Sequence, residues 1–564
     1  MKKIFILVLS FSYFTIAHSQ SVGLGTTVPN ASAALDLTSS NKGLLIPRMG
    51  SSSIHSIPNP AKGLLVYDSA KNQLMVNMGT AAAPDWETII AGSGWGLTGN
   101  THTDSTKNFI GTTDAQPLQF RVNGQVAGMI DSAGGNSYLG YGSGRNNTTG
   151  VFNTAFGYKA IDLNSTGSYN TAFGIQTLSV NTSGSSIGDN NTAIGYQALM
   201  NNRGNAGNTA VGYQALFTNA SNLNTATGYQ ALYHTGSGSN TATGAQALFY
   251  GGGNSNTAIG AKALYNSLSS ASYNTASGYQ ALYSNISGSF NTASGYQALF
   301  SNSSGQFNTA FGSGALYSNR LGNQNVSVGY NSLINTTGSD ENTAIGYQAG
   351  NAYDNGYYNC FIGAETDATG PGFYNCIALG HGTLVTAPNM MRVGNGATVS
   401  IGGPVGWSTI SDGRVKRNIK ENVPGLSFIM KLRPVSYNVD LSAVDRIVQP
   451  PPAKDNDGKV TDRKLSKEMA DARMAKEQLV YTGFVAQEVE HAAKSLHYDF
   501  SGVDAARNDK DLYSLRYADF VVPLVKAVQE LSAQNDQLKK DNELLAKENE
   551  QAMQRITALK ANLH

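Results

Sequence analysis

The sequence is poor in cysteine, in charge and in long apolar runs. Only two cysteines occur, Cys360 and Cys376, with no C-x-x-C pair, which excludes a disulfide scaffold and a cysteine zinc site. Charged residues make up 13% of the chain and the formal net charge is +1, so the overall balance favours neither nucleic acid nor an anionic membrane as a partner. The eight histidines show no metal-ligand spacing, and we predict no metal and no cofactor.

The N-terminal residues 1–19 are typical of a secretory signal peptide. Lys2 and Lys3 precede an apolar run over residues 4–16, and small residues then occupy the two positions that a signal peptidase inspects. We expect the mature chain to begin near Gln20. No cysteine follows the run, which disfavours a lipoprotein anchor, and no later segment has the roughly 18 apolar residues of a membrane helix. The sequence therefore predicts an exported, extracellular or cell-surface protein without a transmembrane segment.

A repeat dominates residues 151–385. Each copy resembles "NTAIGYQAL", and most copies are 17 residues apart, beginning at Asn153, Asn170, Asn191, Asn208, Asn224, Asn240, Asn256, Asn274, Asn291, Asn308, Asn325, Asn342, Asn359 and Asn375. Small residues at fixed places, a β-compatible variable place and a Gly/Ser/Asn-rich loop predict one coil of a β-solenoid, with two short strands and two turns per coil. A disordered low-complexity tract is the alternative, but disorder gives no reason for Leu and an aromatic to return in the same phase.

These copies resemble the head repeats of trimeric autotransporter adhesins, which form a left-handed parallel β-roll from three chains. The resemblance implies a homotrimer. A narrow coil also has little interior of its own to bury, so self-association is physically reasonable. Cys360 and Cys376 both follow a repeat asparagine, and we expect them to replace the same threonine in adjacent coils, as a ladder of small side chains or as a disulfide.

Two segments precede the repeats, an N-terminal β adaptor module at 20–92 and a β linker module at 93–150. Their phrases "VGLGTTVPNASAALDL", "KGLLIPRM" and "FIGTTDAQPLQFRVNG" resemble segments of exported, tail-fibre-like proteins of the Bacteroidota. Short alternating strands in an intertwined adaptor are the expected structure, and no chemistry is attached to these phrases.

The composition changes at Ser411, after a connector at 386–410. Residues 411–564 hold 24 of the 38 Lys and Arg and 23 of the 37 Asp and Glu, which indicates a separate globular domain at 411–523. It opens with "SDGRVKRNIK", and it continues with "LRPVSYNV" from Leu432, "TGFVAQEVE" from Thr482 and "YADFVVPLVKAVQEL" from Tyr517.

These phrases resemble, in order, the auto-processing intramolecular chaperone domain at the C-terminus of phage endosialidase tailspikes. The resemblance implies a catalytic dyad of Ser411 and Lys416 that cuts its own chain next to Ser411. The sequence leaves open whether the broken bond lies before or after Ser411, and the Ile410 side is favoured because attack on the preceding carbonyl is the shorter route, by an N-to-O shift. Asp412 and Arg414 are supporting residues: the aspartate orients the turn or is a plain turn residue, and the arginine is a nearby cation that helps to keep the lysine amine neutral.

Apolar residues recur every seven positions over 524–564, which predicts a parallel coiled coil. One seam holds Leu524, Leu531, Leu538, Leu545, Ala552 and Leu559, and the other holds Val528, Asn535, Asn542, Asn549, Ile556 and Leu563. Seam asparagines fix register and strand number at a cost in stability, which suits a device that aligns identical chains.

The sequence thus predicts a mainly β protein: a trimeric parallel β-solenoid rod, then a small α+β chaperone domain and a coiled coil. We expect an exported fibre whose C-terminal domain aids trimer assembly and cuts itself off. The alternative is a non-cleaving adhesin or glycan-binding fibre with a retained trimerisation domain, and a cell-surface or glycan ligand is possible in either case. A polysaccharide hydrolase is disfavoured because the repeats contain few carboxylates, and an ice-ordering threonine surface ranks low.

Overall fold

The computed structural model describes residues 21–89, 103–183, 186–351, 356–448, 453–454, 460–461 and 465–562. The chain divides into two compact units, Met1–Gly111 and Thr112–His564. The predicted signal peptide at 1–19 lies outside the described residues. Among the helices in the described ranges, none combines the length and the apolar character needed to cross a membrane.

The first unit is a small β module. A four-stranded sheet has the order β3-β4-β5-β6, parallel between β3 and β4 and antiparallel elsewhere, and helix α1 packs on it through the buried Ile54. The buried Asp68 at the end of β4 accepts a hydrogen bond from Ser51, which ties the start of the helix to the sheet. The elements are β1 (Val22–Leu24), β2 (Leu35–Leu37), β3 (Arg48–Met49), α1 (Ser51–His55), β4 (Leu65–Asp68), β5 (Gln73–Asn77) and β6 (Trp86–Ile89).

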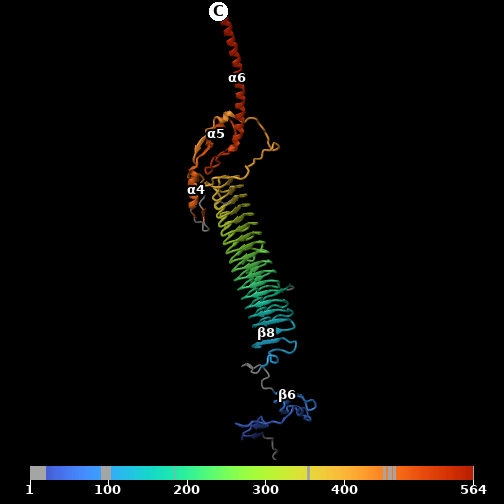
Figure 1. The fold of residues 1–564 in the computed structure, drawn as a ribbon. Coiled ribbons are helices and arrows are strands. Elements are labelled where there is room, and N and C mark those ends of the chain that lie inside the picture. Colours follow the sequence, from blue (N-terminus) through green and yellow to red (C-terminus); the bar gives the residue numbers. More distant parts are fainter. Residues whose placement is uncertain are drawn as a thin grey trace, which may run out of the picture. The chain divides into compact units, whose positions relative to one another are not determined.

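A parallel β-solenoid forms most of the second unit and confirms the predicted rod (Figure 1). Each coil contributes one three-residue strand to a ladder that follows chain order. The ladder consists of β10 (Thr154–Phe156), β11 (Thr171–Phe173), β14 (Thr192–Ile194), β15 (Thr209–Val211), β17 (Thr225–Thr227), β19 (Thr241–Thr243), β20 (Thr257–Ile259), β21 (Thr275–Ser277), β22 (Thr292–Ser294), β23 (Thr309–Phe311), β24 (Val326–Val328), β25 (Thr343–Ile345), β26 (Cys360–Ile362), β28 (Ile377–Leu379) and β30 (Met391–Val393).

The ladder extends beyond 151–385 at both ends. At its start, β9 (Asn136–Leu139) pairs in parallel with β10, while β7 (Leu118–Val122) and β8 (Gln125–Asp131) continue the sheet in antiparallel fashion. At its end, β30 adds a last strand. The antiparallel strands cover an edge that would otherwise offer unpaired backbone groups to another chain.

The strand of each coil alternates between the interior and the surface. In β22 the central Ala293 is fully buried, whereas Thr292 and Ser294 point outward, as the two-residue period of a strand requires. The preceding Asn291 is also fully buried, and its side chain bonds to the asparagines of both neighbouring coils. The outward position tolerates Phe, Ile, Val, Thr or Ser because solvent, and not a packed core, surrounds it.

The other leg of the coil is a turn and not the second strand that the sequence analysis expected. In "GYQAL" the residues Gln297 and Leu299 both have a left-handed backbone, with φ of 53° and 51°, which breaks any extended run. Leu299 is nevertheless fully buried. Outside the main ladder, the second unit's described residues hold only two-residue strands in the rod: β12 (Thr182–Ser183), β13 (Ser186–Ile187), β16 (Thr218–Asn219), β18 (His234–Thr235), β27 (Asp367–Ala368) and β29 (Leu384–Val385).

A single coil gains little stability on its own. Burying one leucine contributes about 2–3 kcal/mol, while each non-glycine residue in the left-handed region costs about 1–2 kcal/mol. Because a coil holds three such residues, as at Gln297, Leu299 and Phe307, its stability depends on the hydrogen bonds and packing of the coils on either side. The glycine between strand and turn permits the stacking: at Gly295 (φ 142°), a Cβ atom would lie 2.5 Å from the carbonyl oxygen of Gly312 in the next coil.

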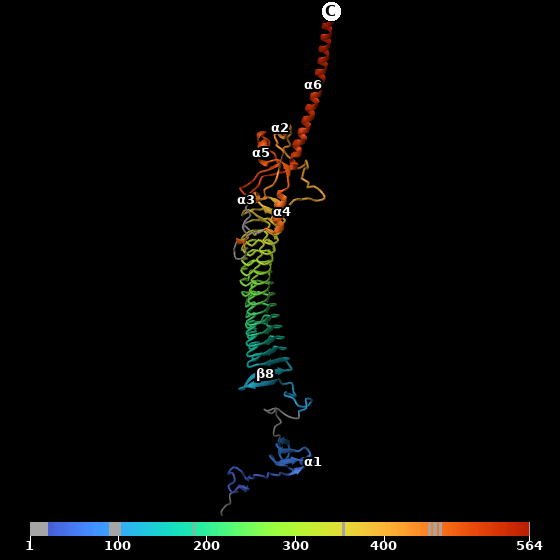
Figure 2. The same ribbon diagram turned by 60° about the vertical axis from the view of Figure 1, so that its left-hand side comes forward.

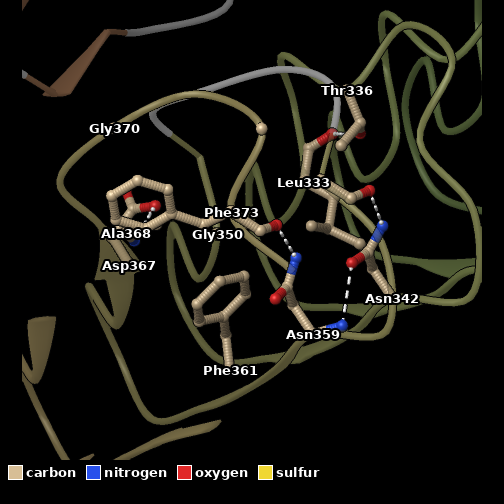
Figure 3. Close-up of a pocket in the computed structure, with 12 residues that line it drawn as sticks. Leu333, Thr336, Asn342, Gly350, Asn359, Phe361, Asp367, Ala368, Gly370 and Phe373 are labelled. Carbon is tan, nitrogen blue, oxygen red and sulfur yellow. Dashed lines mark hydrogen bonds between the residues drawn. The ribbon is translucent and has the colours of Figure 1, made fainter. Parts of the chain in front are cut away.

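Two adjacent coils near the end of the rod pack their interiors differently. Phe361 lies where neighbouring strands place Ala344 and Ala378, and in the preceding coil Gly350 takes the place of the usual leucine. A Cβ atom on Gly350 would lie 2.9 Å from the Phe361 ring, so the large and the small residue compensate for each other. Phe361 is one of the residues that line a cavity of about 20 Å³ between the coils (Figure 3).

The two cysteines do not occupy equivalent positions, which corrects the sequence alignment. Cys360 pairs with Ile377, so Cys376 aligns with the repeat asparagine, and its backbone N–H donates to the Asn359 side chain (3.0 Å). Because neighbouring residues of a strand point to opposite faces, the buried Cys376 lies inside the coil and the half-buried Cys360 lies outside. Both thiols are free, and burial raises the pKa of each.

A small α+β domain follows the rod. Its core is formed by Phe428, Val489, Phe500, Phe520 and two alanines of α5. The elements are α2 (Leu426–Ile429), β31 (Val435–Tyr437), α3 (Leu441–Val448), β32 (Ala453–Lys454), β33 (Val460–Thr461), α4 (Lys467–Glu477), β34 (Tyr481–Gly483), α5 (Ala486–Ser495), β35 (Val503–Asp504), β36 (Ser514–Leu515), η1 (Tyr517–Phe520) and α6 (Val521–Ala561).

Helix α6 runs without a break for 41 residues and extends beyond the domain core (Figure 2). Its first turns are held by the domain, since the Glu530 carboxylate accepts the backbone N–H of Leu426 (2.8 Å). The heptad residues beyond this point, such as Leu538 (59% exposed), are uncovered in the single chain. The long helix is as predicted; the coiled coil between chains stays a prediction, and Leu563 lies outside the described residues.

Candidate active site

An exposed connecting segment carries the predicted catalytic residues. We call residues 399–410 the strap: it has no regular structure, and every residue in it is exposed. It includes Trp407 (86% exposed) and Ile410 (85% exposed), which immediately precedes Ser411. In both views the segment runs as an open loop between the end of the rod and the C-terminal domain (Figures 1 and 2).

A tight turn brings Ser411 and Lys416 together. The backbone N–H of Val415 donates to the Asp412 carbonyl (3.1 Å), and that of Lys416 donates to the Gly413 carbonyl (3.3 Å). The chain therefore reverses direction within five residues. As a result, Lys416 Nζ lies 2.8 Å from Ser411 Oγ, within hydrogen-bonding distance.

Asp412 and Arg414 hold this turn from the side. The Asp412 carboxylate accepts the Arg414 backbone N–H (2.8 Å) and its guanidinium Nε (2.9 Å). These hydrogen bonds lower the pKa of Asp412. Arg414 is thus engaged by the aspartate and its side chain is 88% exposed, so its clearest contact is with the turn and not with the lysine amine.

The dyad is open to solvent in the single chain. Both Ser411 and Lys416 are exposed, as are the residues on either side of them apart from the half-buried Asp412. A lysine takes a proton from a hydroxyl only as the neutral amine, and that form is favoured where water is excluded. The turn provides the geometry of a Ser/Lys pair, and the surrounding chain leaves it uncovered.

The three later phrases of the domain come together in space. Strand β31 from "LRPVSYNV" pairs in antiparallel fashion with β34 from "TGFVAQEVE". Arg433 of the first phrase forms an ion pair with Glu488 of the second, and the backbone N–H of Phe484 donates to the Tyr517 hydroxyl of the third (3.1 Å). These three phrases form the scaffold of the C-terminal domain, and the exposed turn at Ser411–Lys416 is the first part of that domain.

The sequence analysis missed a second group of polar residues, in the loop between β35 and β36. Arg507, Asn508 and Asp511 contact the last coils of the rod. No spacing or motif marks them in the sequence, because their partners are mostly backbone atoms more than 110 residues away.

Comparison with known families finds a match at each end of the chain. Residues 23–105 match the family described as phage tail like trimerisation region. Residues 411–496 match the family described as chaperone of endosialidase, and the match begins at Ser411. A search of curated proteins found no match to the chain. The chain is therefore tail-fibre-like, with a trimerisation region, a β-solenoid rod and a chaperone domain of an autoproteolytic family.

Proposed function

From a chain with a phage-tail-like trimerisation region at one end and a chaperone-of-endosialidase domain at the other, we infer a homotrimeric surface fibre that processes itself. Its C-terminal domain assembles three chains and then cuts each chain next to Ser411. The observation that carries this proposal is the 2.8 Å contact between Lys416 Nζ and Ser411 Oγ at the first residues of the matched domain.

The reaction uses only groups of the chain and one water. Ser411 Oγ attacks the carbonyl carbon of Ile410 while the neutral Lys416 amine takes the hydroxyl proton. The C–N bond to Ser411 breaks as the lysine returns that proton to the leaving nitrogen, which leaves an ester between Ile410 and the Ser411 side chain. Water then hydrolyses the ester, giving a carboxylate on Ile410 and a free serine at the new N-terminus.

The exposed position of the dyad makes cleavage depend on assembly. In the single chain Lys416 is exposed to water. Neighbouring copies that cover the turn would exclude water and favour the neutral amine. We therefore expect the trimer to cut and the monomer to stay intact, so the cut follows assembly.

The rod explains why a chaperone is needed. An isolated coil gains little, since the strain of its three left-handed residues offsets the burial of its leucine. Copies that look alike can also pair in the wrong register, and long-range pairing is slow. A domain that folds and trimerises separately gives the first coil a defined partner.

Matched variants test the dyad. Lys416→Arg keeps the positive charge but cannot act as a base, since a guanidinium stays protonated, and Ser411→Ala removes the nucleophile. Both should abolish the fragment of residues 411–564 on a denaturing gel. Lys420→Arg, four residues further along the same exposed segment, should leave cleavage unchanged.

The second candidate function is a non-cleaving fibre that keeps its trimerisation domain. The solvent-exposed dyad favours this alternative, because the described residues leave Lys416 uncovered and do not exclude water from it. An intact wild-type trimer would support it and would remove the proposal of self-cleavage. Appearance of the fragment in Lys416→Arg would instead assign the cut to another base or to a contaminating protease.

A further inference from the structure

The loop at residues 504–512, which we call the clamp, binds the end of the rod. Two of its side chains donate to backbone carbonyls of the last coils: Arg507 Nη1 to Pro388 (2.9 Å) and Asn508 Nδ2 to Thr386 (2.8 Å). Within the rod, the carbonyls at positions equivalent to Pro388, such as those of Ser303 and Arg320, accept N–H groups from the preceding coil. Arg507 and Asn508 add side-chain donors from the C-terminal domain to the carbonyls of the last coils.

Asp511 is the centre of the clamp. Its side chain is 3% exposed, and it accepts hydrogen bonds from Thr386 Oγ1 and, at 3.4 Å, from Arg392 Nη2, both of them residues of the rod. The same carboxylate accepts the backbone N–H groups of Arg507 (3.1 Å) and Leu512 (3.0 Å), which fix the shape of the loop. A buried carboxylate with four donors is a strong contact whose loss is costly.

Two lysines extend the contact on either side. Lys476 Nζ at the end of α4 donates to the Thr398 carbonyl (2.6 Å), and Lys510 Nζ lies 3.5 Å from the Thr369 carbonyl. The domain therefore binds the rod mostly through backbone oxygens, which are present in any coil with this geometry.

We propose that the clamp keeps the cleaved chaperone domain attached to the rod, so that processing gives a nicked but capped fibre. This inference rests on the proposed cut next to Ser411. All the contacts described above join the rod side of the cut, residues 369–398, to the domain side, residues 476–512. The strap between them is exposed throughout, so cutting it removes the covalent link without removing the clamp.

The capped fibre would gain two properties from this arrangement. The clamp donates to the Thr386 and Pro388 carbonyls in the last coils, so these acceptors are not offered to another rod. Three donors of the clamp bind backbone carbonyls and so depend on coil geometry, whereas Asp511 depends on the side chains of Thr386 and Arg392. The partner that this surface fits is the folded end of a 17-residue β-solenoid.

The test separates attachment from self-cleavage. In a full-length Ser411→Ala chain, the exposed residues 402–406 are replaced by the recognition sequence of a site-specific protease, and the strap is cut by adding that protease. The products are run on a size-exclusion column without denaturant and then on a denaturing gel. The proposal predicts that the rod and the C-terminal fragment elute together. Separate elution overturns it, whatever the result for the wild-type dyad.

Variants of the clamp identify which residues hold the C-terminal fragment on the rod. Asp511→Asn should weaken retention at least about a hundredfold, since breaking a buried charged contact has that effect. The neighbouring Asp509→Asn is the matched control, because Asp509 is exposed, and it should retain the fragment. The double variant Arg507→Ala/Asn508→Ala alters only exposed side chains and covers the case in which Asp511→Asn does not fold. Undiminished retention in a folded clamp variant would refute the assignment.

Discussion

Removing one internal asparagine should open the rod locally, and Asn291→Ala is the most informative case. The Asn291 side chain makes four hydrogen bonds. It donates to Asn274 Oδ1 (3.2 Å) and to the Gly305 carbonyl (2.8 Å), and it accepts from the backbone N–H (2.9 Å) and the Nδ2 (3.2 Å) of Asn308. The side chain is fully buried, so no water replaces these contacts.

The free-energy cost of Asn291→Ala depends on which of the groups bonded to Asn291 keep another hydrogen-bond partner. Asn274 Oδ1 still accepts the backbone N–H of residue 291 (3.0 Å), the Gly305 carbonyl still accepts Asn302 Nδ2 (3.0 Å), and Asn308 Nδ2 still reaches the Gly322 carbonyl (2.7 Å). The Asn308 backbone N–H loses its acceptor. One orphaned buried donor costs about 1–3 kcal/mol, and the other lost bonds add about 1 kcal/mol. We expect a loss of about 3 kcal/mol.

Amide hydrogen exchange measures this loss of stability at individual residues of the rod. A loss of about 3 kcal/mol corresponds to roughly a hundredfold faster exchange at residue 308 and its neighbours if exchange occurs by local opening. Thr292→Ala is the control, since the adjacent Thr292 points outward and is exposed. Unchanged protection at residue 308 in Asn291→Ala, or equal loss in the control, would refute the assignment of coil stability to the asparagine ladder.

Three further predictions concern the packing and the thiols of the rod. Gly295→Ala should destabilise the rod by more than about 3 kcal/mol, because its Cβ would meet the backbone of the next coil, whereas Gly338→Ala has open space and should be nearly neutral in thermal unfolding. Phe361→Ala should cost about 3–5 kcal/mol and Gly350→Leu should clash, but the double variant restores the usual coil interior and should be more stable than either single variant in denaturant titrations. Because burial raises the pKa of the Cys376 thiol, its alkylation in the folded protein should begin at a higher pH than in the unfolded chain, and equal pH profiles would contradict its buried position.

The repeat period made the rod predictable. The fixed phase of asparagine, alanine and glycine identifies the strand of each coil, and the structure confirms one strand at each predicted copy. The start of the C-terminal domain at Ser411 was equally readable, because charge and motif change together there. Ser411 and Lys416 were paired through the resemblance to the family and not through their spacing alone, and their side chains lie 2.8 Å apart.

Other features depend on tertiary structure and were not predictable. A leucine normally avoids the left-handed region, and only the stacked coils hold Leu299 there, so a second strand was expected in its place. The cysteines appeared equivalent because both follow an asparagine, but hydrogen-bond register, and not local sequence, puts Cys376 at the asparagine position. The clamp residues bind backbone atoms, which carry no sequence signal.

The central claim is that the chain cuts itself next to Ser411 after assembly. The most direct measurement is the intact mass of the purified wild-type protein under denaturing conditions, together with the N-terminal residue of any C-terminal fragment. A fragment of residues 411–564 that begins with Ser411, and that is absent from the Ser411→Ala variant, is the predicted result. A single uncut chain in a wild-type sample shown to be trimeric, or a fragment with a different N-terminus, would contradict it.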